Sequence, residues 1–274
     1  MSPACRYLLL VAYDGSGFHG FADNRGVRTV AGTLAAAITK VARHPVVLTC
    51  AGRTDAGVHA WGQVVHFDAP AGLDVDRLRD ACNKLCRPAI VVREAGVARP
   101  DFDARHDAVA RTYRYSLLQR RVPDPFRHHL TWHQPEPLDL DAMEAASAVL
   151  VGEHDFASFC RRRTVSGPDG AEIVASTIRR VRRAEWRRLP DDLLRFEIEA
   201  NAFCHQMVRS ITGTLVDIGR GRSRVADLAA VLAAADRSAA GQVAPPHGLC
   251  LWAVTYPSDP GSSGAQLSTE RSAP

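Results

Sequence analysis

Long hydrophobic runs are missing from this chain of 274 residues. The longest apolar run near its start, residues 7–13, ends at Asp14 and is far shorter than the ~20 residues that a membrane-spanning helix needs. No small-residue cleavage site follows this run, as it would in a secretion signal. We therefore expect a soluble, cytoplasmic protein without a membrane partner. The hydrophobic content of 46% is enough for one large domain or for two fused halves.

The sequence also lacks the cysteine spacing of a zinc site. Its seven cysteines are an odd number, and only Cys82 and Cys86 lie close together, with no second pair to complete four ligands. Cys204 adjoins His205, but neighbouring residues of a helix or strand do not point at one metal. We expect reduced, mostly buried thiols.

Lysine is almost absent, since Lys40 and Lys84 are the only two, whereas arginine is frequent and the net charge is +4. The preference for arginine over lysine is as typical of a biased genomic base composition as of a function in binding. Two local clusters are more informative. Their arginines are Arg161, Arg162 and Arg163, and then Arg179, Arg180, Arg182, Arg183, Arg187 and Arg188. Arginine forks suit phosphate, so the clusters indicate either a nucleic-acid surface or an ordinary solvated face.

Hydrophobic periodicity predicts an α+β fold of two similar halves. Strands are expected at residues 6–13, 46–50, 64–67 and 90–97, then at 109–118, 178–186, 193–200 and 249–256. Helices are expected at residues 29–42, 76–85, 140–151, 203–218 and 225–235, with Thr29 and Asp139 as caps. Two β-α-β-β-α-β patterns indicate two ferredoxin-like halves, residues 1–105 and 106–257. Residues 166–172 are expected to form a surface loop and residues 258–274 a flexible tail.

The stretch Ala51-Gly52-Arg53-Thr54-Asp55-Ala56-Gly57-Val58-His59-Ala60 lies between two expected strands. It places one carboxylate, Asp55, among small residues, two positions after Arg53. An aspartate that faces an arginine is held ionised, so it can act as a nucleophile or a base. An isolated aspartate in a loop more often forms an ordinary Asx turn with a routine ion pair.

The string G-R-T-D-A-G-V-H within this stretch resembles the catalytic loop of the TruA family of tRNA pseudouridine synthases. Further segments are similar to that family in the same order, and together the resemblance covers residues 6–257. They are residues 13–20, 27–30, 62–67, 102–105, 111–115 and 200–209. The resemblance implies the pseudouridine synthase fold, in which the two RNP-like halves form a continuous, mostly antiparallel sheet flanked by helices.

The resemblance also implies roles for four residues. Asp55 matches the catalytic aspartate, which attacks the sugar C1′, adds to the base or abstracts a sugar proton to give a glycal; these routes stay open. Tyr113 matches the tyrosine that stacks on the target uracil and helps to remove the C5 proton, although an alternating strand alone would place it in the core. Arg209 matches an arginine that pairs with Asp55, although on its own it is equally a helix-surface cation. Arg53 is expected to fill the space of the flipped nucleotide or to anchor its phosphate.

The resemblance implies an isomerase that needs no metal or organic cofactor, which agrees with the lack of a metal-ligand cluster or a phosphate-cradling glycine loop in the sequence. Its substrate would be tRNA, at positions 38, 39 and 40 of the anticodon stem-loop, and it would work as a homodimer. His59, His66 and His205 are expected to serve in packing or in contacts to RNA.

The sequence departs from the family at Phe21, Leu85 and Arg87. These changes leave open a diverged paralogue that isomerises a free uridine nucleotide in C-nucleoside biosynthesis. A third hypothesis is a non-catalytic RNA-binding or folding protein, but such a protein would have no evident need for Asp55.

Overall fold

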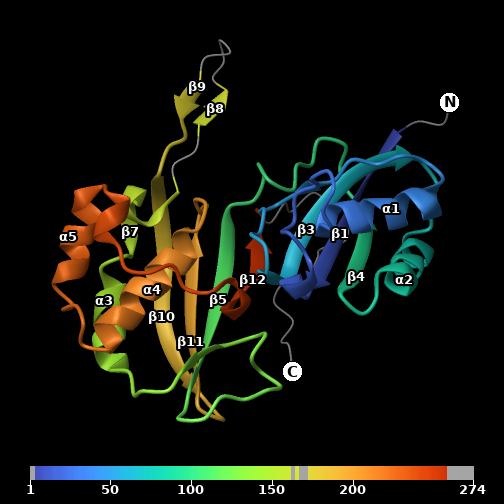
Figure 1. The fold of residues 1–274 in the computed structure, drawn as a ribbon. Coiled ribbons are helices and arrows are strands. Elements are labelled where there is room, and N and C mark those ends of the chain that lie inside the picture. The colour runs from blue at the N-terminus through green and yellow to red at the C-terminus, as the bar shows by residue number, and fades with distance from the viewer. Residues whose placement is uncertain (1–3, 162–163, 167–171, 258–274) are drawn as a thin grey trace. The chain divides into compact units, whose positions relative to one another are not determined.

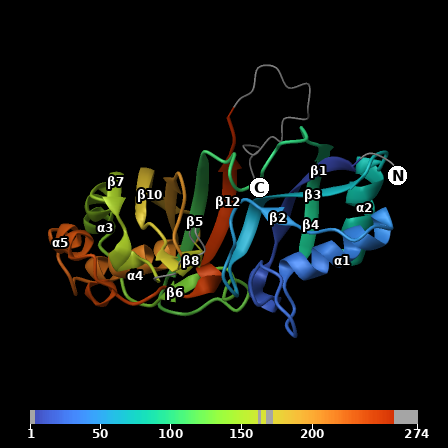
Figure 2. The same cartoon turned by 90° about the horizontal axis from the view of Figure 1, so that it is seen from above.

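The chain divides into two compact units, the first made of residues 1–111 and 250–274 and the second of residues 112–249. The structure, a computed structural model, describes residues 4–161, 164–166 and 172–257 (Figures 1 and 2). The last strand, β12 (Leu249–Thr255), thus falls almost wholly within the first unit, whereas the sequence pattern placed it with the second half. Chain order gives no sign that a strand returns to an earlier sheet. The tail expected at residues 258–274 lies outside the described residues.

The first unit is a sheet with two helices. Its elements are β1 (Ala4–Tyr13), α1 (Val30–Ala42), β2 (Thr49–Cys50), β3 (His59–Pro70), α2 (Val75–Cys86) and β4 (Ile90–Val97), with a 3₁₀ turn η1 (Gly15–Gly17). β1 pairs antiparallel with both β3 and β4. β2 and β12 pair with different parts of β3. β2 runs antiparallel to it at Val65 and His66, and β12 runs parallel to it at His59 and Ala60. The expected order of strand, helix, strand, strand, helix, strand is confirmed.

Burial explains why these residues form these elements. Leu9, Leu10 and Val11 at the centre of β1 have no exposed surface, and neither have Leu34 and Ile38 on the inner side of α1. Burying an apolar side chain of this size stabilises the fold by about 1.5–3 kcal/mol. The predicted cap of α1 is confirmed, because the side chain of Thr29 accepts a hydrogen bond from the Gly32 N–H at 3.2 Å.

The second unit begins within β5 and carries three helices. Its elements are β5 (Ala110–Gln119), β6 (Trp132–Gln134), α3 (Leu140–Ala148), β7 (Gly152–Asp155), β8 (Thr164–Ser166), β9 (Glu172–Val174), β10 (Ile178–Leu189), β11 (Leu193–Ala200), α4 (Met207–Gly219) and α5 (Asp227–Ala234). Three 3₁₀ turns are η2 (Ala157–Phe159), η3 (Arg237–Ala239) and η4 (Pro246–Gly248). The strand order is β5-β11-β10-β7, β6 runs parallel beside β5, and β8 and β9 pair with each other in a second sheet. The predicted α+β class is confirmed, and the sheet of each unit is mostly antiparallel.

The two faces of the second sheet differ in chemistry. Along β11, Phe196 and its alternating neighbours are fully buried, and Phe196 stacks on Trp186 of β10 at a centroid distance of 4.9 Å. Trp186 also donates its indole N–H to Ser147 of α3 at 3.1 Å, so this face lies under the helices. The other side of β11 carries Glu197, which bonds Arg114 of β5 at 2.5 Å and Arg183 of β10 at 2.6 Å. The arginines of this sheet are therefore tied at least in part to carboxylates.

Two sequence-based expectations are corrected here. The helix expected from residue 203 begins at Met207, because Gln206 has a φ of 65°, in the left-handed region, and a right-handed helix cannot pass through it. The strands β6, β7, β8 and β9 were not expected, since each has only three or four residues and shows no alternation of its own. Of the surface loop expected at residues 166–172, residues 167–171 lie outside the described part. None of the helices among the described residues reaches the length and hydrophobicity of a membrane span.

Candidate active site

The loop between β2 and β3 presents Asp55 at the edge of the first unit. Gly57 has a φ of 77°, which allows a tight turn in which the Val58 N–H bonds the Asp55 carbonyl at 3.1 Å. Asp55 is half-buried, whereas Arg53 is exposed and Thr54 is buried. A carboxylate that is partly accessible among small residues can meet a substrate closely, which is what a nucleophile or a general base requires.

A buried polar network holds the loop from below. The Tyr13 hydroxyl, at the end of β1, lies 2.8 Å from the Thr54 hydroxyl oxygen. Gln63 of β3 has no exposed surface; its side-chain amide donates to the Gly52 carbonyl at 2.6 Å and to the Tyr13 hydroxyl at 3.4 Å. The Gly52 N–H donates back to the amide oxygen of Gln63 at 3.3 Å. The loop segment that leads into Asp55 is thereby fixed to β1 and β3, and such preorganisation is what catalytic geometry needs.

The turn after β1 packs directly on this loop. The Phe21 N–H donates to the Thr54 carbonyl at 3.0 Å. At Gly15 a Cβ atom would lie 2.1 Å from the Val58 carbonyl oxygen, and at Gly20, with a φ of 90°, it would lie 2.9 Å from the Thr54 carbonyl oxygen. Only glycine permits this approach, so the similarity of the turn to the TruA family has a physical reason in the position of the Asp55 loop.

Phe21, one of the departures from the family, is a core residue. Its side chain is 2% exposed and its ring lies 6.1 Å from that of Tyr13. It therefore supports the Asp55 loop from the interior and offers almost no surface to a ligand. Leu85 and Arg87, the other two departures, are exposed at the end of α2.

Arg111 supports the Asp55 loop, whereas the sequence matched this residue only as part of a signature, without assigning it a role. The side chain is 8% exposed, and it donates to the carbonyls of Ala51 at 3.0 Å, Arg105 at 2.5 Å and Ala108 at 2.9 Å. It thus fixes the first residue of the Asp55 loop to the segment that precedes β5. The match of residues 111–115 to a family segment is the signal that the sequence offered.

Two of the three histidines serve in packing. His59 and His66 are each 6% exposed, and their Nδ1 atoms accept hydrogen bonds from the backbone N–H groups of Gly15 at 3.1 Å and Ala104 at 3.0 Å. Burial lowers the pKa of His66, which agrees with a neutral ring in this role. The packing role expected for them is confirmed, whereas His205 is half-buried and its role stays a prediction.

Tyr113 and Arg209 belong to the second unit. Tyr113 lies on β5, is 8% exposed, and meets the ring of Phe203 edge-on at 5.0 Å. Arg209 is half-buried on α4, and its Nε donates to the Ala244 carbonyl at 2.8 Å. The Ala244 N–H in turn donates to the backbone carbonyl of Arg209 at 3.0 Å.

The four predicted site residues form two pairs. Arg53 and Asp55 share one loop of the first unit, while Tyr113 on β5 and Arg209 on α4 belong to the second. The pairing of Arg209 with Asp55 joins the two units and stays a prediction.

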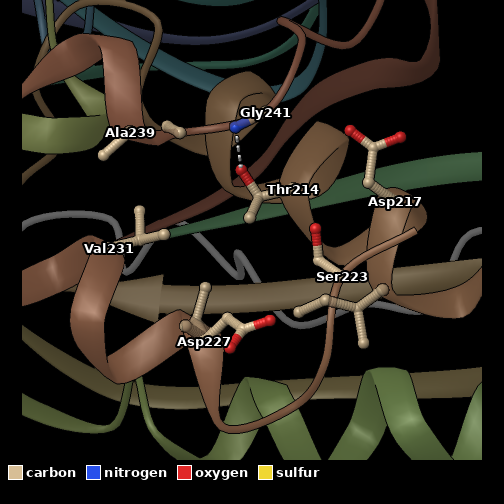
Figure 3. A pocket seen from close by; sticks show the side chains of 10 residues that line it. Thr214, Asp217, Ser223, Asp227, Val231, Ala239 and Gly241 are labelled. Atoms are coloured by element: carbon tan, nitrogen blue, oxygen red, sulfur yellow. Dashed lines mark hydrogen bonds between the residues drawn. The ribbon is translucent and has the colours of Figure 1, made fainter. Parts of the chain in front are cut away.

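A cavity of about 120 Å³ in the second unit has no part in this site. It lies between α4, α5 and the segment around Gly241, whose N–H donates to the Thr214 hydroxyl at 3.0 Å (Figure 3). Its two carboxylates face arginines: Asp217 lies 3.7 Å from Arg220 and Asp227 lies 2.8 Å from Arg224. Within the described ranges, no three histidine, cysteine or acidic side chains come together as a metal site requires.

Known proteins match nearly the whole chain. The tRNA pseudouridine synthase family model matches residues 9–107 and 146–257; the first segment contains Arg53 and Asp55, the second contains Arg209, and Tyr113 lies between them. A tRNA pseudouridine synthase A of Methylobacterium sp. (strain 4-46) is 44% identical over 93% of this chain and 99% of its own length. The tRNA pseudouridine synthase A of Frankia casuarinae is 44% identical over 93% of this chain and 90% of its own length. That of Brevibacillus brevis is 39% identical over 92% of this chain and 99% of its own length.

Proposed function

This chain belongs to the tRNA pseudouridine synthase family, and we propose that it is an isomerase that converts uridine to pseudouridine in tRNA. The observation that carries the proposal is the loop of residues 51–58. It presents one half-buried carboxylate, Asp55, directly after a backbone segment that Tyr13, Gln63 and Arg111 hold by hydrogen bonds.

The chemistry needs few groups. The bond between N1 of uracil and C1′ of ribose breaks, the base turns, and C5 bonds to C1′; the C5 proton leaves and N1 gains a proton, so the reaction is balanced without a co-reactant. Asp55 attacks C1′, adds to the base or takes a sugar proton in the first step. Tyr113 stacks on the base and assists the loss of the C5 proton. Arg53 takes the place of the flipped nucleotide or anchors its phosphate, and Arg209 pairs with Asp55.

The substrate that we propose is tRNA rather than a free nucleotide. The relatives named above carry tRNA in their names. The departures that motivated the mononucleotide hypothesis do not reshape the Asp55 loop, because Phe21 is buried beneath it and Leu85 and Arg87 are exposed on α2. By family resemblance the target uridines lie at positions 38, 39 and 40 of the anticodon stem-loop. Remote contacts to such a stem supply the binding energy that orients and flips the base.

We also propose that the protein acts as a homodimer in the cytoplasm, in keeping with the same resemblance. Light scattering on the purified chain measures the first point directly. Twice the mass of the chain at micromolar concentration supports the dimer, and a monomer that still modifies tRNA contradicts it.

One experiment separates the three functional hypotheses. The protein is incubated with unmodified tRNA and, separately, with uridine monophosphate, and the nucleosides are analysed by chromatography and mass spectrometry after digestion. The proposal predicts pseudouridine in the anticodon stem-loop and none from the mononucleotide. Pseudouridine from the mononucleotide alone would support the paralogue, and tRNA binding without turnover would support the non-catalytic protein.

A further inference from the structure

Two cysteines of the second unit that the proposed isomerisation does not use lie beside each other. Cys160 ends the short turn η2 and is 1% exposed, whereas Cys204 lies in the turn before α4 and is half-buried. A backbone hydrogen bond of 3.1 Å, from the Arg161 N–H to the His205 carbonyl, joins the residues that follow them. The two thiols also influence each other's pKa, which requires that they lie near one another. Segments far apart in sequence thus bring the two cysteines into one neighbourhood.

One cation favours the ionised form of both thiols. The charge of Arg179 on β10 lowers the pKa of each, and its guanidinium is held by a 2.6 Å bond from Nη1 to the Ile178 carbonyl. Its Nε–H is buried and finds no hydrogen-bond acceptor among the described residues. A negatively charged thiolate is the kind of hydrogen-bond acceptor that suits this positively charged donor. Asp155, the other charged group that acts on the pair, opposes ionisation, but its carboxylate accepts bonds from the Ala157 N–H at 3.0 Å and the Thr177 hydroxyl at 2.5 Å.

The two sulfurs differ in character. The hydrogen bond from Cys160, together with the charge of Arg179, lowers the pKa of the Cys204 thiol below its usual range, even though burial acts in the opposite direction. The hydrogen bond to Cys204, followed by burial, raises the pKa of the Cys160 thiol. Exposure separates the two sulfurs in the same way, because half-buried Cys204 can meet a small oxidant whereas Cys160 is 1% exposed; this arrangement suits a nucleophilic cysteine with a buried resolving partner.

We propose that Cys160 and Cys204 are a redox-active pair that forms a reversible disulfide with a hydroperoxide as oxidant. The Cys204 thiolate attacks one oxygen of the peroxide, the O–O bond breaks, and a sulfenic acid forms while hydroxide leaves and takes up a proton. The Cys160 thiol then attacks the sulfenic sulfur, its proton goes to the departing oxygen, and water leaves. Two electrons pass from the two sulfurs to the peroxide, and a dithiol reverses the step by exchange.

The chain contains a matched control pair. Cys82 and Cys86 lie one turn apart on α2, and both are buried. Burial raises the pKa of Cys82 to about 12 and also raises that of Cys86. Both pairs therefore place two cysteines close together, but among the described residues no group lowers the pKa of either thiol on α2.

The disulfide would act on the segment that leads into α4. Cys204 follows Phe203, whose ring packs edge-on against Tyr113 at 5.0 Å, and α4 carries Arg209. A covalent tie from Cys204 to Cys160 restrains this segment and with it the platform for the target base. This consequence rests on the proposed function, whereas the formation of the disulfide does not.

Peptide mapping of the full-length protein tests the pair. The reduced protein is treated with a small excess of hydrogen peroxide, blocked with an alkylating agent, digested and analysed by mass spectrometry. We expect a Cys160–Cys204 disulfide that dithiothreitol removes, in the wild type and in Cys86→Ser alike. In Cys160→Ser, Cys204 should stop at a sulfenic acid that dimedone traps. A disulfide elsewhere, or thiols at 160 and 204 that stay alkylatable, would overturn the proposal.

A second measurement needs no variant. In the wild type at pH 7, iodoacetamide should label Cys204 more than about tenfold faster than Cys82 or Cys86, because only the thiolate reacts and Cys82 is hardly ionised. Equal labelling rates would contradict the proposed asymmetry.

The effect on turnover is measured on the same samples. Oxidised wild type should isomerise uridine in tRNA at least several-fold more slowly than reduced wild type, and Cys160→Ser should not respond. A disulfide without any change in rate would refute the link to Tyr113. A reduced protein that forms no pseudouridine would refute the proposed function, and the peptide map would still decide whether the pair exists.

Discussion

The hydroxyl pair beneath the Asp55 loop offers a quantitative test of how the site is held. Tyr13→Phe removes the hydroxyl that lies 2.8 Å from the Thr54 oxygen and keeps the ring against Phe21. Thr54→Val removes the other hydroxyl at nearly constant shape. Each single change leaves the partner hydroxyl without this bond, which costs about 1–3 kcal/mol, whereas the double change removes both hydroxyls. The longer bond from Gln63 to Tyr13, 3.4 Å, is lost equally in Tyr13→Phe and in the double variant. We therefore expect the two losses in the free energy of unfolding to be non-additive by about 1 kcal/mol.

The same pair should matter for catalysis. Misplacing a catalytic group by ~1 Å costs up to about a hundredfold in rate. We expect each single variant to lower single-turnover pseudouridine formation by about tenfold or more, with little change in the affinity for tRNA. Tyr7→Phe is the matched control, because its hydroxyl bonds Pro70 at 3.2 Å and Leu73 at 3.1 Å at the other end of β1. It should reduce stability to a similar degree and leave turnover unchanged.

Urea unfolding of the four proteins of the cycle, with single-turnover kinetics on unmodified tRNA, makes the comparison. Losses that add within about 0.3–0.5 kcal/mol would show that the two hydroxyls do not depend on each other. Turnover that falls equally in Tyr7→Phe would show that general destabilisation, rather than the position of the Asp55 loop, controls the rate.

Three further changes test other parts of the account. Arg111→Met leaves three carbonyls without their donor and should lower the free energy of unfolding, measured by urea denaturation, by about 3 kcal/mol. A loss below about 1 kcal/mol would contradict the supporting role of Arg111. Tyr113→Phe should bind tRNA normally but turn over slowly, because the ring stays and the hydroxyl is lost; equal single-turnover rates would limit the residue to stacking. Burial raises the pKa of Glu197, but Arg114 and Arg183 outweigh this effect and the net pKa is lowered from its ordinary value of 4.5. The contribution of Glu197 to stability is therefore complete above about pH 4.5 and is lost as the pH falls through the lowered pKa. In Glu197→Gln, the free energy of unfolding should fall less steeply with pH below about 4.5 than in the wild type. The same slope in both proteins would refute this assignment.

The fold was predictable where local rules agree with tertiary packing. β11 was placed to the residue, because its alternation of apolar and charged residues matches a sheet with one face under helices. Asp139 was predicted to cap α3, and its side chain accepts the Ala142 N–H at 2.9 Å. The start of α4 was predicted wrongly, because Phe203 to Gln206 have helical spacing, but a left-handed residue ends the turn.

The candidate site was predictable only in its chemistry. The loop sequence identified Asp55 as the reactive carboxylate, but nothing local indicated that Gln63 and Tyr13 meet beneath it. That contact depends on the antiparallel register of β1 and β3, in which Tyr13 lies opposite Ala60 after a bulge. The redox pair was missed for the same reason, since Cys160 and Cys204 are brought together by tertiary structure and show no spacing that a motif search would find.

The carboxylate of Asp55 is the central claim, and one substitution tests it most directly. Asp55→Asn replaces one carboxylate oxygen by an amide NH2 group and does not remove any of the backbone hydrogen bonds of the loop. With unmodified tRNA in single turnover, the variant should form no detectable pseudouridine, while it still binds tRNA with nearly wild-type affinity, since binding is spread over many phosphates. Asp80→Asn, an equivalent change at an exposed position on α2, should keep wild-type activity. Pseudouridine formation by purified Asp55→Asn at even a few per cent of the wild-type rate would contradict the account.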